Sequence, residues 1–241
     1  MARVDFQIGQ VFERSLKIYF SSFVPIFVLG LVVFSPLVFL NVAFPETMTR
    51  GSGSLLDVVL IVLPLILGSL LSAALTSLVL EKLRGREASI GSCLQKGFQR
   101  LPLLLVLNLL MGLIILVGMV LVLIPGLIAV IMLSVAVPVF VAERASIGDS
   151  IKRSFRLTKS AFWPVCALFL LYFVAMVLVM TPLMLLLGFI GLKSMVALNL
   201  GSVLLNIVFA GVQAVLAVVV YHELRTKGEG ATSDELLEVF S

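Results

Sequence analysis

Five of the amide and hydroxyl side chains in the long apolar segments of this chain have the spacing of a site. Asn199, Asn206 and Gln213 lie seven residues apart in one segment. Seven residues are almost two helical turns, so these amides share one helix face. Ser202 lies beside that face, and Asn108 adds an amide from another segment. An amide in hydrocarbon needs a hydrogen-bond partner, so we expect this polar stripe to face a helix bundle's interior.

Two interpretations of the polar stripe are open. The amides could link neighbouring helices, each hydrogen bond contributing about 0.6 kcal/mol. They could instead line a polar path, or a site for a lipid headgroup or a small neutral solute. Small residues in the same segment, such as Gly201 and Ala210, favour close helix packing and therefore the first interpretation.

Basic side chains gather on three short amphipathic segments. In residues 146–160, Ile147, Ile151 and Phe155 recur every four positions, which predicts a helix with an apolar face and a basic flank. The segment's opening serine and Asp149 fit an N-terminal capping pair. Such a helix lies on a membrane surface, where each basic residue gains about 1 kcal/mol from anionic lipid. The predicted headgroup contacts are Arg14, Lys17, Lys96, Arg100, Lys152, Arg153, Arg156 and Lys159.

A plainer interpretation of the basic segments is that they only anchor and orient the neighbouring spans. An acidic surface of a protein partner is a further candidate for contact with them. The sequence pI of about 9.3 does not indicate nucleic-acid binding. Membrane topology accounts for the basic charge, which beside a bilayer needs no nucleic acid.

The groups that catalysis and ion coupling need are missing from the apolar segments. No Asp, Glu, Lys, Arg or His stands near the middle of one, whereas proton-coupled carriers keep such groups at membrane depth. The single histidine, His222, follows the last apolar segment. Cys93 and Cys166 have neither disulfide nor metal-site spacing, and no phosphate-binding loop occurs. We expect no enzymatic activity, no metal and no cofactor.

Composition predicts that the elements carrying these groups are transmembrane helices. Of 241 residues, 61% are hydrophobic and 12% charged, and the mean hydropathy is +1.23. Soluble domains are nearer half apolar, and the runs here exceed the ~20 residues that cross a bilayer. We predict an all-α polytopic membrane protein, with a turn at Pro125-Gly126 and a kink at Pro138 near the end of the fourth span. The six expected spans are 22–44, 55–80, 101–124, 127–141, 164–190 and 195–221.

Basic residues also set the expected orientation. Arg50 and Lys193 fall in loops on one side, and the other fifteen of the 17 Lys and Arg residues fall on the opposite side. Short loops rich in Lys and Arg stay cytoplasmic. We therefore expect a multi-pass protein of the cell inner membrane with both termini in the cytoplasm.

Internal repetition predicts how the spans are organised. Ala-Ser-Ile-Gly occurs at Ala88–Gly91 and again at Ala145–Gly148, and a diverged copy centres on Ile8-Gly9. Each copy opens an amphipathic stretch that an apolar run follows, so we predict three repeats of an interfacial helix plus a helical hairpin. We assign one membrane domain, 1–241, with repeats at 5–80, 88–142 and 145–221 and a cytoplasmic tail at 222–241.

Three motifs resemble a known family. They are Ile124-Pro-Gly with Ala136-Val-Pro and Glu143; Ser150-Ile-Lys-Arg-Ser-Phe-Arg-Leu-Thr-Lys159; and Tyr221-His-Glu-Leu-Arg225. The pattern is similar to the membrane domain found with some bacterial glycerophosphoryl diester phosphodiesterases and in stand-alone membrane proteins. The resemblance implies a six-span bacterial inner-membrane domain. It implies no catalytic residue here, because in fused members those belong to a separate soluble domain.

Two functional hypotheses follow. The first is a non-enzymatic inner-membrane protein whose interfacial helices contact anionic lipids or a membrane partner, such as a second copy, in an accessory or envelope role. The second is a transporter or channel that moves a lipid-like or small neutral solute along the polar stripe.

Overall fold

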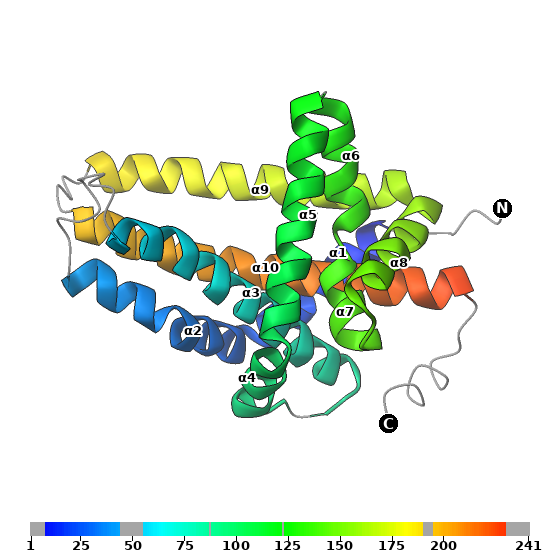
Figure 1. Ribbon diagram of the computed structural model, residues 1–241, viewed down its shortest axis with the longest axis horizontal. Helices are drawn as coiled ribbons and strands as arrows, with labels where there is room; N and C mark the ends of the chain where they lie inside the picture. The colour runs from blue at the N-terminus through cyan, green and yellow to red at the C-terminus, as the bar shows by residue number, and fades with distance from the viewer. Residues whose placement is uncertain (1–7, 44–54, 87, 122, 190–194, 230–241) are drawn as a thin grey trace.

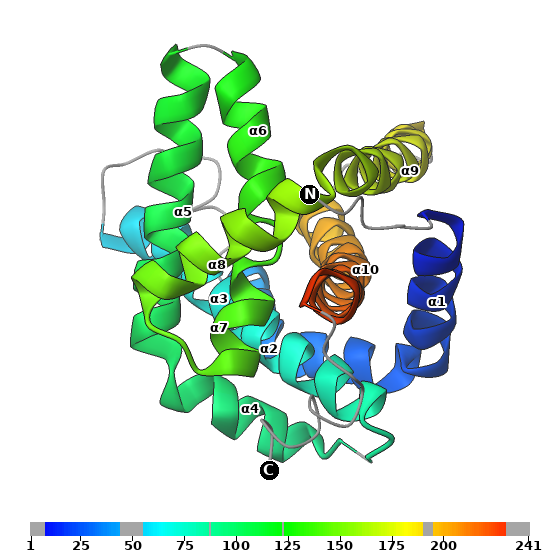
Figure 2. The same ribbon diagram turned by 90° about the vertical axis from the view of Figure 1, so that its right-hand side faces the viewer.

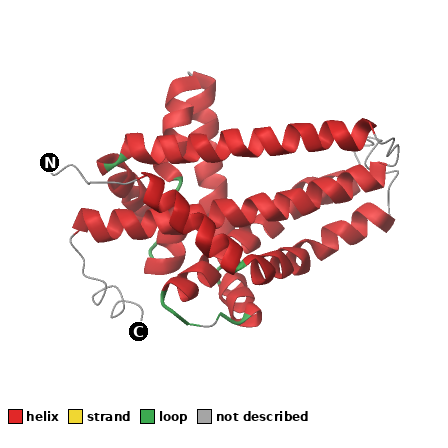
Figure 3. Cartoon of the chain, turned by 180° about the vertical axis from the view of Figure 1, so that it is seen from behind, coloured by secondary structure: helices red, strands yellow, loops and turns green. Residues whose placement is uncertain are grey.

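The computed structural model describes residues 8–43, 55–86, 88–121, 123–189 and 195–229. The regular elements in these residues are all helices (Figure 3), which confirms the all-α prediction. The helices are α1 (Ile8–Ser21), α2 (Phe23–Ala43), α3 (Leu55–Leu83), α4 (Ile90–Gln99), α5 (Leu101–Leu121), α6 (Leu123–Leu133), α7 (Ala136–Glu143), α8 (Ile147–Ser160), α9 (Phe162–Phe189) and α10 (Met195–Glu229).

Six helical segments are long and apolar enough to cross a membrane, as the sequence predicted. They lie in α2, α3, α5, α9 and α10, and in α6 together with α7. The 21 residues of α2 extend about 31 Å at 1.5 Å per residue, which matches a hydrocarbon layer of about 30 Å. The chain is therefore a multi-pass membrane protein.

The spanning helices run in two directions. In Figure 1, α2, α3, α9 and α10 lie alongside one another, whereas the hairpin of α5 and α6 runs across them. Viewed along α10, the hairpin projects to one side (Figure 2). Its tip carries large exposed apolar side chains, with Val120 exposed by 78% and Leu123 by 71%. Such a surface suits contact with lipid rather than water.

The fourth span differs from its prediction at both ends. α5 ends at Leu121 and α6 begins at Leu123, so the predicted turn at Pro125-Gly126 is wrong. Proline lacks a backbone N–H, so the first turn of α6 accommodates Pro125. Gly126 instead permits close approach of α5 and α6. A Cβ added to Gly118 would lie 2.9 Å from the Cα of Gly126.

The structure has no kink at Pro138 itself. The helix instead breaks shortly before it, between α6 and α7. Turn residues Ser134 and Val135 separate α6 from α7, and Pro138 stands in the first turn of α7. Pro138 has no N–H to donate to the carbonyl four residues before it, so one helix cannot continue through this point unperturbed. At the other end of the chain, α10 continues to Glu229, so residues 222–229 of the predicted tail are helical, and residues 230–241 lie outside the described part.

The core forms where the C-terminal halves of α3 and α10 meet the shorter helices. Leu75, Leu78, Val218 and Tyr221 are each at most 2% exposed. The outer ends of the spans are more exposed, since only 11% of the α9 span is buried. The protein is therefore packed most tightly at the end that holds α1, α4 and α8.

The three amphipathic helices pack on spans in a cyclic order. α4 packs on α3, α8 on α6 and α7, and α1 on α10. Each thus contacts the second span of the preceding predicted repeat, and the first repeat contacts the last. The Ser154 hydroxyl donates to the Met132 carbonyl at 2.6 Å, and the Tyr19 phenol donates to the Val208 carbonyl at 3.2 Å. Each amphipathic helix therefore packs on a span outside its own predicted repeat.

The face by which these helices pack is not the expected apolar stripe. The buried residues follow the aligned glycines by two and six positions; they are Val11 and Ser15, Cys93 and Gly97, and Ser150 and Ser154. The predicted stripe lies beside this face, and its last members stay exposed, Phe98 by 62% and Phe155 by 37%. Small residues bring each helix close to its span.

Candidate functional site

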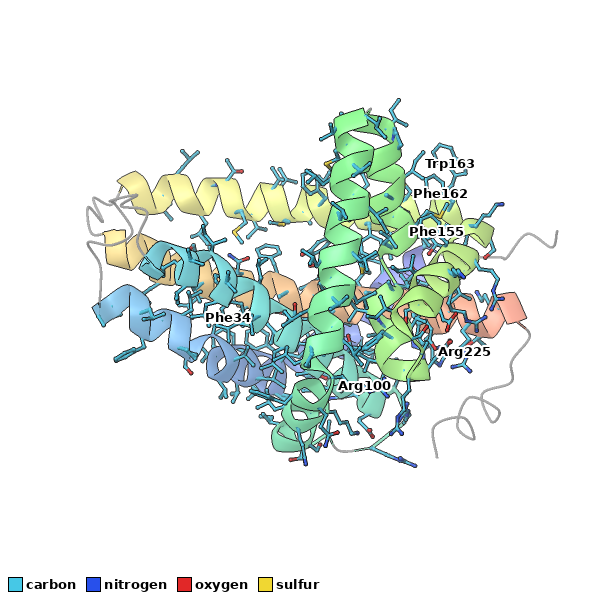
Figure 4. The ribbon with its side chains drawn as sticks, in the orientation of Figure 1. Phe34, Arg100, Phe155, Phe162, Trp163 and Arg225 are labelled. Carbon is cyan, nitrogen blue, oxygen red and sulfur yellow. The ribbon has the colours of Figure 1, made fainter. Side chains whose placement is uncertain are left out.

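The main candidate site is a cavity of about 720 Å³ among α2, α3, α5, α6, α7, α9 and α10. Four members of the polar stripe line it, namely Asn108, Ser202, Asn206 and Gln213. Its volume lies within the roughly 300–1,000 Å³ of small-molecule sites. The walls are otherwise mostly apolar, and Phe34 lines the cavity from α2 (Figure 4). Folding therefore brings together two members of the polar stripe, Asn108 and Gln213, that lie 105 positions apart in the sequence.

Only part of the polar stripe is used in helix packing. The Asn108 amide of α5 donates to the Ser69 hydroxyl of α3 at 2.8 Å, an interhelical hydrogen bond. The Asn206 amide donates at 3.0 Å to the carbonyl of Ser202 in its own helix. Gln213 is exposed to the cavity, and its amide has no hydrogen-bond partner among the described residues. Asn199 belongs to α10, but its side chain lies outside what the structure describes.

Hydroxyl groups extend the polar lining beyond the predicted stripe. Thr76 donates to the Ser72 carbonyl at 2.7 Å, and Ser134 donates to the Ile131 carbonyl at 2.7 Å. Each hydroxyl oxygen keeps lone pairs that a ligand donor can use. Ser134 stands at the break between α6 and α7, which a continuous fourth span could not have indicated.

The predicted headgroup contacts divide into exposed and inward-facing groups. The Arg153 Nε lies 3.3 Å from the Glu143 carboxylate, and its side chain is only 15% exposed. The Lys96 Nζ lies 2.9 Å from Glu81, with the lysine half exposed. Arg100 places its guanidinium 5.6 Å from the Phe140 ring centroid. The members exposed on α1 and α8 are Arg14, Lys17, Lys152, Arg156 and Lys159.

Arg153 belongs to a polar network that the sequence analysis missed. The Tyr221 phenol donates to Glu143 at 2.9 Å, and the Arg225 guanidinium donates to that phenol oxygen at 3.1 Å. The network joins α7, α8 and α10. Each of the three motifs that carry the family resemblance contributes a member, and that coincidence was the available signal.

The predicted cap of α8 is confirmed. The backbone N–H of Asp149 donates to the Ser146 hydroxyl oxygen at 3.2 Å. The same hydroxyl donates to the Asp149 carboxylate at 2.6 Å. The cap fixes where α8 begins and therefore which of its residues pack inward and which stay exposed.

The described residues include no cluster of His, Cys, Asp and Glu able to hold a metal ion. Cys93 is fully buried on α4, and burial raises the pKa of its thiol. A raised pKa keeps a thiol protonated and unreactive, so Cys93 acts as a packing residue. Burial likewise raises the pKa of the Tyr19 phenol, which stays a hydrogen-bond donor to α10.

Comparison with known proteins finds no family model that matches this chain and no similar curated protein or solved structure. The cavity, the basic surfaces and the polar network therefore carry the functional argument by themselves.

Proposed function

We propose that this multi-pass membrane protein binds a neutral, lipid-like molecule in the cavity lined by the polar stripe. The observation that carries the proposal is the Gln213 amide, which faces the cavity without a partner among the described residues. An amide shielded from water costs several kcal/mol unless something bonds to it. Solvent or a ligand in the cavity must therefore supply that bond.

The lining favours a neutral amphiphile over an ion. No charged side chain lines the cavity in the described part of the chain, so neither a phosphate nor a metal ion would find a counter-charge. Asn206 and Gln213 both offer a donor and an acceptor to a hydroxyl, ester or amide group. The apolar walls suit acyl chains. The ligand either stays bound within the protein or is transported, and transport is the second form of the same proposal.

The test is saturable binding of radiolabelled diacylglycerol to the protein in nanodiscs. The double variant Asn206→Leu, Gln213→Leu removes both amides, and we expect at least tenfold weaker binding at an unchanged melting temperature. Gln95→Leu on α4 is the matched control, because Gln95 is an exposed amide that does not line the cavity. Equal binding by the double variant and the wild type contradicts the proposal, as does absence of saturable binding by the wild type.

A second candidate function is contact with anionic lipid through the surfaces of α1 and α8. Its specific observation is that exposed Lys152, Arg156 and Lys159 adjoin exposed aromatic residues at the α8–α9 junction. Trp163 is exposed by 77%, and Figure 4 shows it beside Phe162 and Phe155. Tryptophan at a headgroup layer beside basic residues is typical of membrane interfaces. Neutralising these lysines and Arg156 should reduce anionic lipid that purifies with the protein; an unchanged lipid content contradicts this function.

The location proposed for both functions is the bacterial inner membrane, with the basic ends and both termini in the cytoplasm. The asymmetry of Lys and Arg supports this orientation. The resemblance to the phosphodiesterase-associated membrane domain supports a six-span unit without catalysis. We propose that the protein has no enzymatic activity. Contact of the amphipathic helices with a membrane partner or a second copy is part of the second candidate function.

A further inference from the structure

A second hollow, of about 370 Å³, opens among α3, α4, α5 and α7 and shares no lining residue with the first cavity. Its walls carry an excess of positive charge. Two carboxylates line it, those of Glu81 and Glu143. Four cationic side chains oppose them, namely Arg84, Lys96, Arg100 and Arg144.

Both carboxylates are already engaged. Glu81 lies 2.9 Å from Lys96 and 3.7 Å from Arg84. Glu143 lies 3.3 Å from Arg153, which is not in the hollow, and accepts the Tyr221 phenol at 2.9 Å. The acidic groups therefore cannot also neutralise the remaining arginines.

Arg100 and Arg144 form no ion pair with any described residue. Arg100 stands where α4 joins α5 (Figure 4), and its guanidinium packs over the Phe140 ring at 5.6 Å. Such stacking orients a guanidinium but leaves its charge and its N–H donors available. Two arginines thus face one hollow without a counter-ion among the described residues.

The backbone at Arg144 is strained. Its φ of 50° and ψ of 30° lie in the left-handed region, which side chains other than glycine rarely adopt. A residue held in that region costs on the order of 1 kcal/mol or more and is found preferentially at ligand sites. The strain ends α7 and sets Arg144 on the wall of the hollow.

We infer that this hollow binds a phosphate group through Arg100 and Arg144, and that the phosphate belongs to the headgroup of an anionic lipid. Arginine offers a planar fork of donors that fits two phosphate oxygens at once. Basic pockets between helices at the cytoplasmic face typically hold anionic headgroups. Phe98 and Leu103, each next in the sequence to a residue that lines the hollow, are exposed by 62% and 50% and offer apolar surface for acyl chains.

Arg84 adds support from its surroundings. Its side chain is 16% exposed, and burial lowers the pKa of its guanidinium despite nearby Glu81. Folding has partly removed the Arg84 guanidinium from water, and a phosphate bound in the hollow would stabilise its positive charge.

This site is distinct from the lipid contact proposed for α1 and α8. Lys152 and Lys159 are exposed on α8 and do not line the hollow. The matched control is Lys82→Gln, Arg86→Gln, because both residues are exposed, lie outside the hollow and have no part in either lipid proposal. It makes the same change in charge as the double variant Arg100→Gln, Arg144→Gln inside the hollow.

The experiment is a titration of the detergent-solubilised protein with phosphatidylglycerol, read by native mass spectrometry and by melting temperature. We expect one saturable phosphatidylglycerol in the wild type and none of comparable affinity for phosphatidylcholine. The hollow variant should bind at least about tenfold more weakly, since hydrogen bonds to charged groups contribute about 1.5–3 kcal/mol each. The control should keep the saturable lipid.

Two further arms secure the result. Arg100→Lys keeps the charge but loses the fork, so it should bind several-fold more weakly even if the double variant folds poorly. Stabilisation by inorganic phosphate, lost in the double variant, would keep the phosphate site but overturn the lipid as its source. Equal phosphatidylglycerol affinity in wild type and double variant, or an equal loss in the control, overturns the site itself.

Discussion

The phenol of Tyr221 in α10 donates a 2.9 Å hydrogen bond to the carboxylate of Glu143 at the end of α7. Glu143 also pairs with Arg153 of α8, so one carboxylate joins three helices. Glu143→Ala leaves Arg153 without its carboxylate, and we expect a loss of about 2–3 kcal/mol of unfolding free energy. Tyr221→Phe removes one hydrogen bond and should cost about 1 kcal/mol. Denaturant unfolding in micelles gives both values.

The control for the network is Ser21→Ala, which removes an exposed hydroxyl that bonds only to Ile18 of its own helix. It should change stability by less than about 0.5 kcal/mol. A larger loss for Tyr221→Phe than for Glu143→Ala would contradict the central place given to the carboxylate.

Gly211 marks a close approach of α10 to α1 and α2. A Cβ there would lie 2.6 Å from the Ile26 side chain and 3.0 Å from the Tyr19 ring. Gly211→Val should therefore cost about 1–3 kcal/mol through overpacking. Gly112→Ala on α5 meets open space and should instead stabilise its helix by about 0.5–1 kcal/mol. Melting temperatures of the two variants should move in opposite directions, and a shift of the same sign argues against this packing.

Cys93 should resist alkylation in the folded protein. Its thiol is fully buried, and burial raises its pKa, so little thiolate forms at pH 8. In a Cys166→Ala background, we expect maleimide labelling only after unfolding, whereas Ser92→Cys on the same helix, at an exposed position, should label at once. Rapid labelling of native Cys93 would disprove the packing of α4 on α3.

The same thiol predicts how stability depends on pH. The folded pKa of Cys93 lies above the unfolded value of about 8.5, so its burial contributes fully below that pH. As pH rises past the unfolded value, the unfolded chain ionises first and stability declines. Cys93→Ala should show a shallower decline between pH 8 and 10 in thermal unfolding, and parallel profiles would exclude a contribution from this group.

Accessibility of single cysteines tests the proposed orientation. In a cysteine-free background, Lys152→Cys should react with an impermeant maleimide only when the cytoplasmic face is opened, and Lys193→Cys should react in intact spheroplasts. The reverse pattern would place α8 on the outer side and remove the basis for both anionic-lipid proposals, that for α1 and α8 and that for the basic hollow.

The sequence predicted the spans well because length and apolar content alone determine them. α9 begins within two residues of its predicted start, and α8 begins at its predicted cap. The turn at Pro125-Gly126 failed because proline suits the first turn of a helix as well as a reversal. The packing face of α8 also escaped prediction. Counting apolar residues overlooks Ser150 and Ser154, whose hydroxyls bond to backbone carbonyls and can therefore be buried.

The sites were predictable to different degrees. The polar stripe was visible because seven-residue spacing places Asn206 and Gln213 on one face whatever the tertiary structure. The basic hollow was not, because Arg84, Arg100 and Arg144 come from separate segments that only folding brings together. The close packing of α5 against α6 also depends on Gly118 meeting Gly126 rather than on a periodic signal in either segment.

The cyclic packing order has a consequence for biosynthesis. α1 leaves the ribosome before the other described helices, yet the carbonyl to which its Tyr19 phenol donates belongs to Val208, 189 positions later. Until α10 has been translated and inserted, α1 lacks the surface against which most of its packing occurs. The contact between α1 and α10 therefore forms late in assembly. In truncated chains that lack α10, α1 would stay undocked and accessible to quality-control proteases.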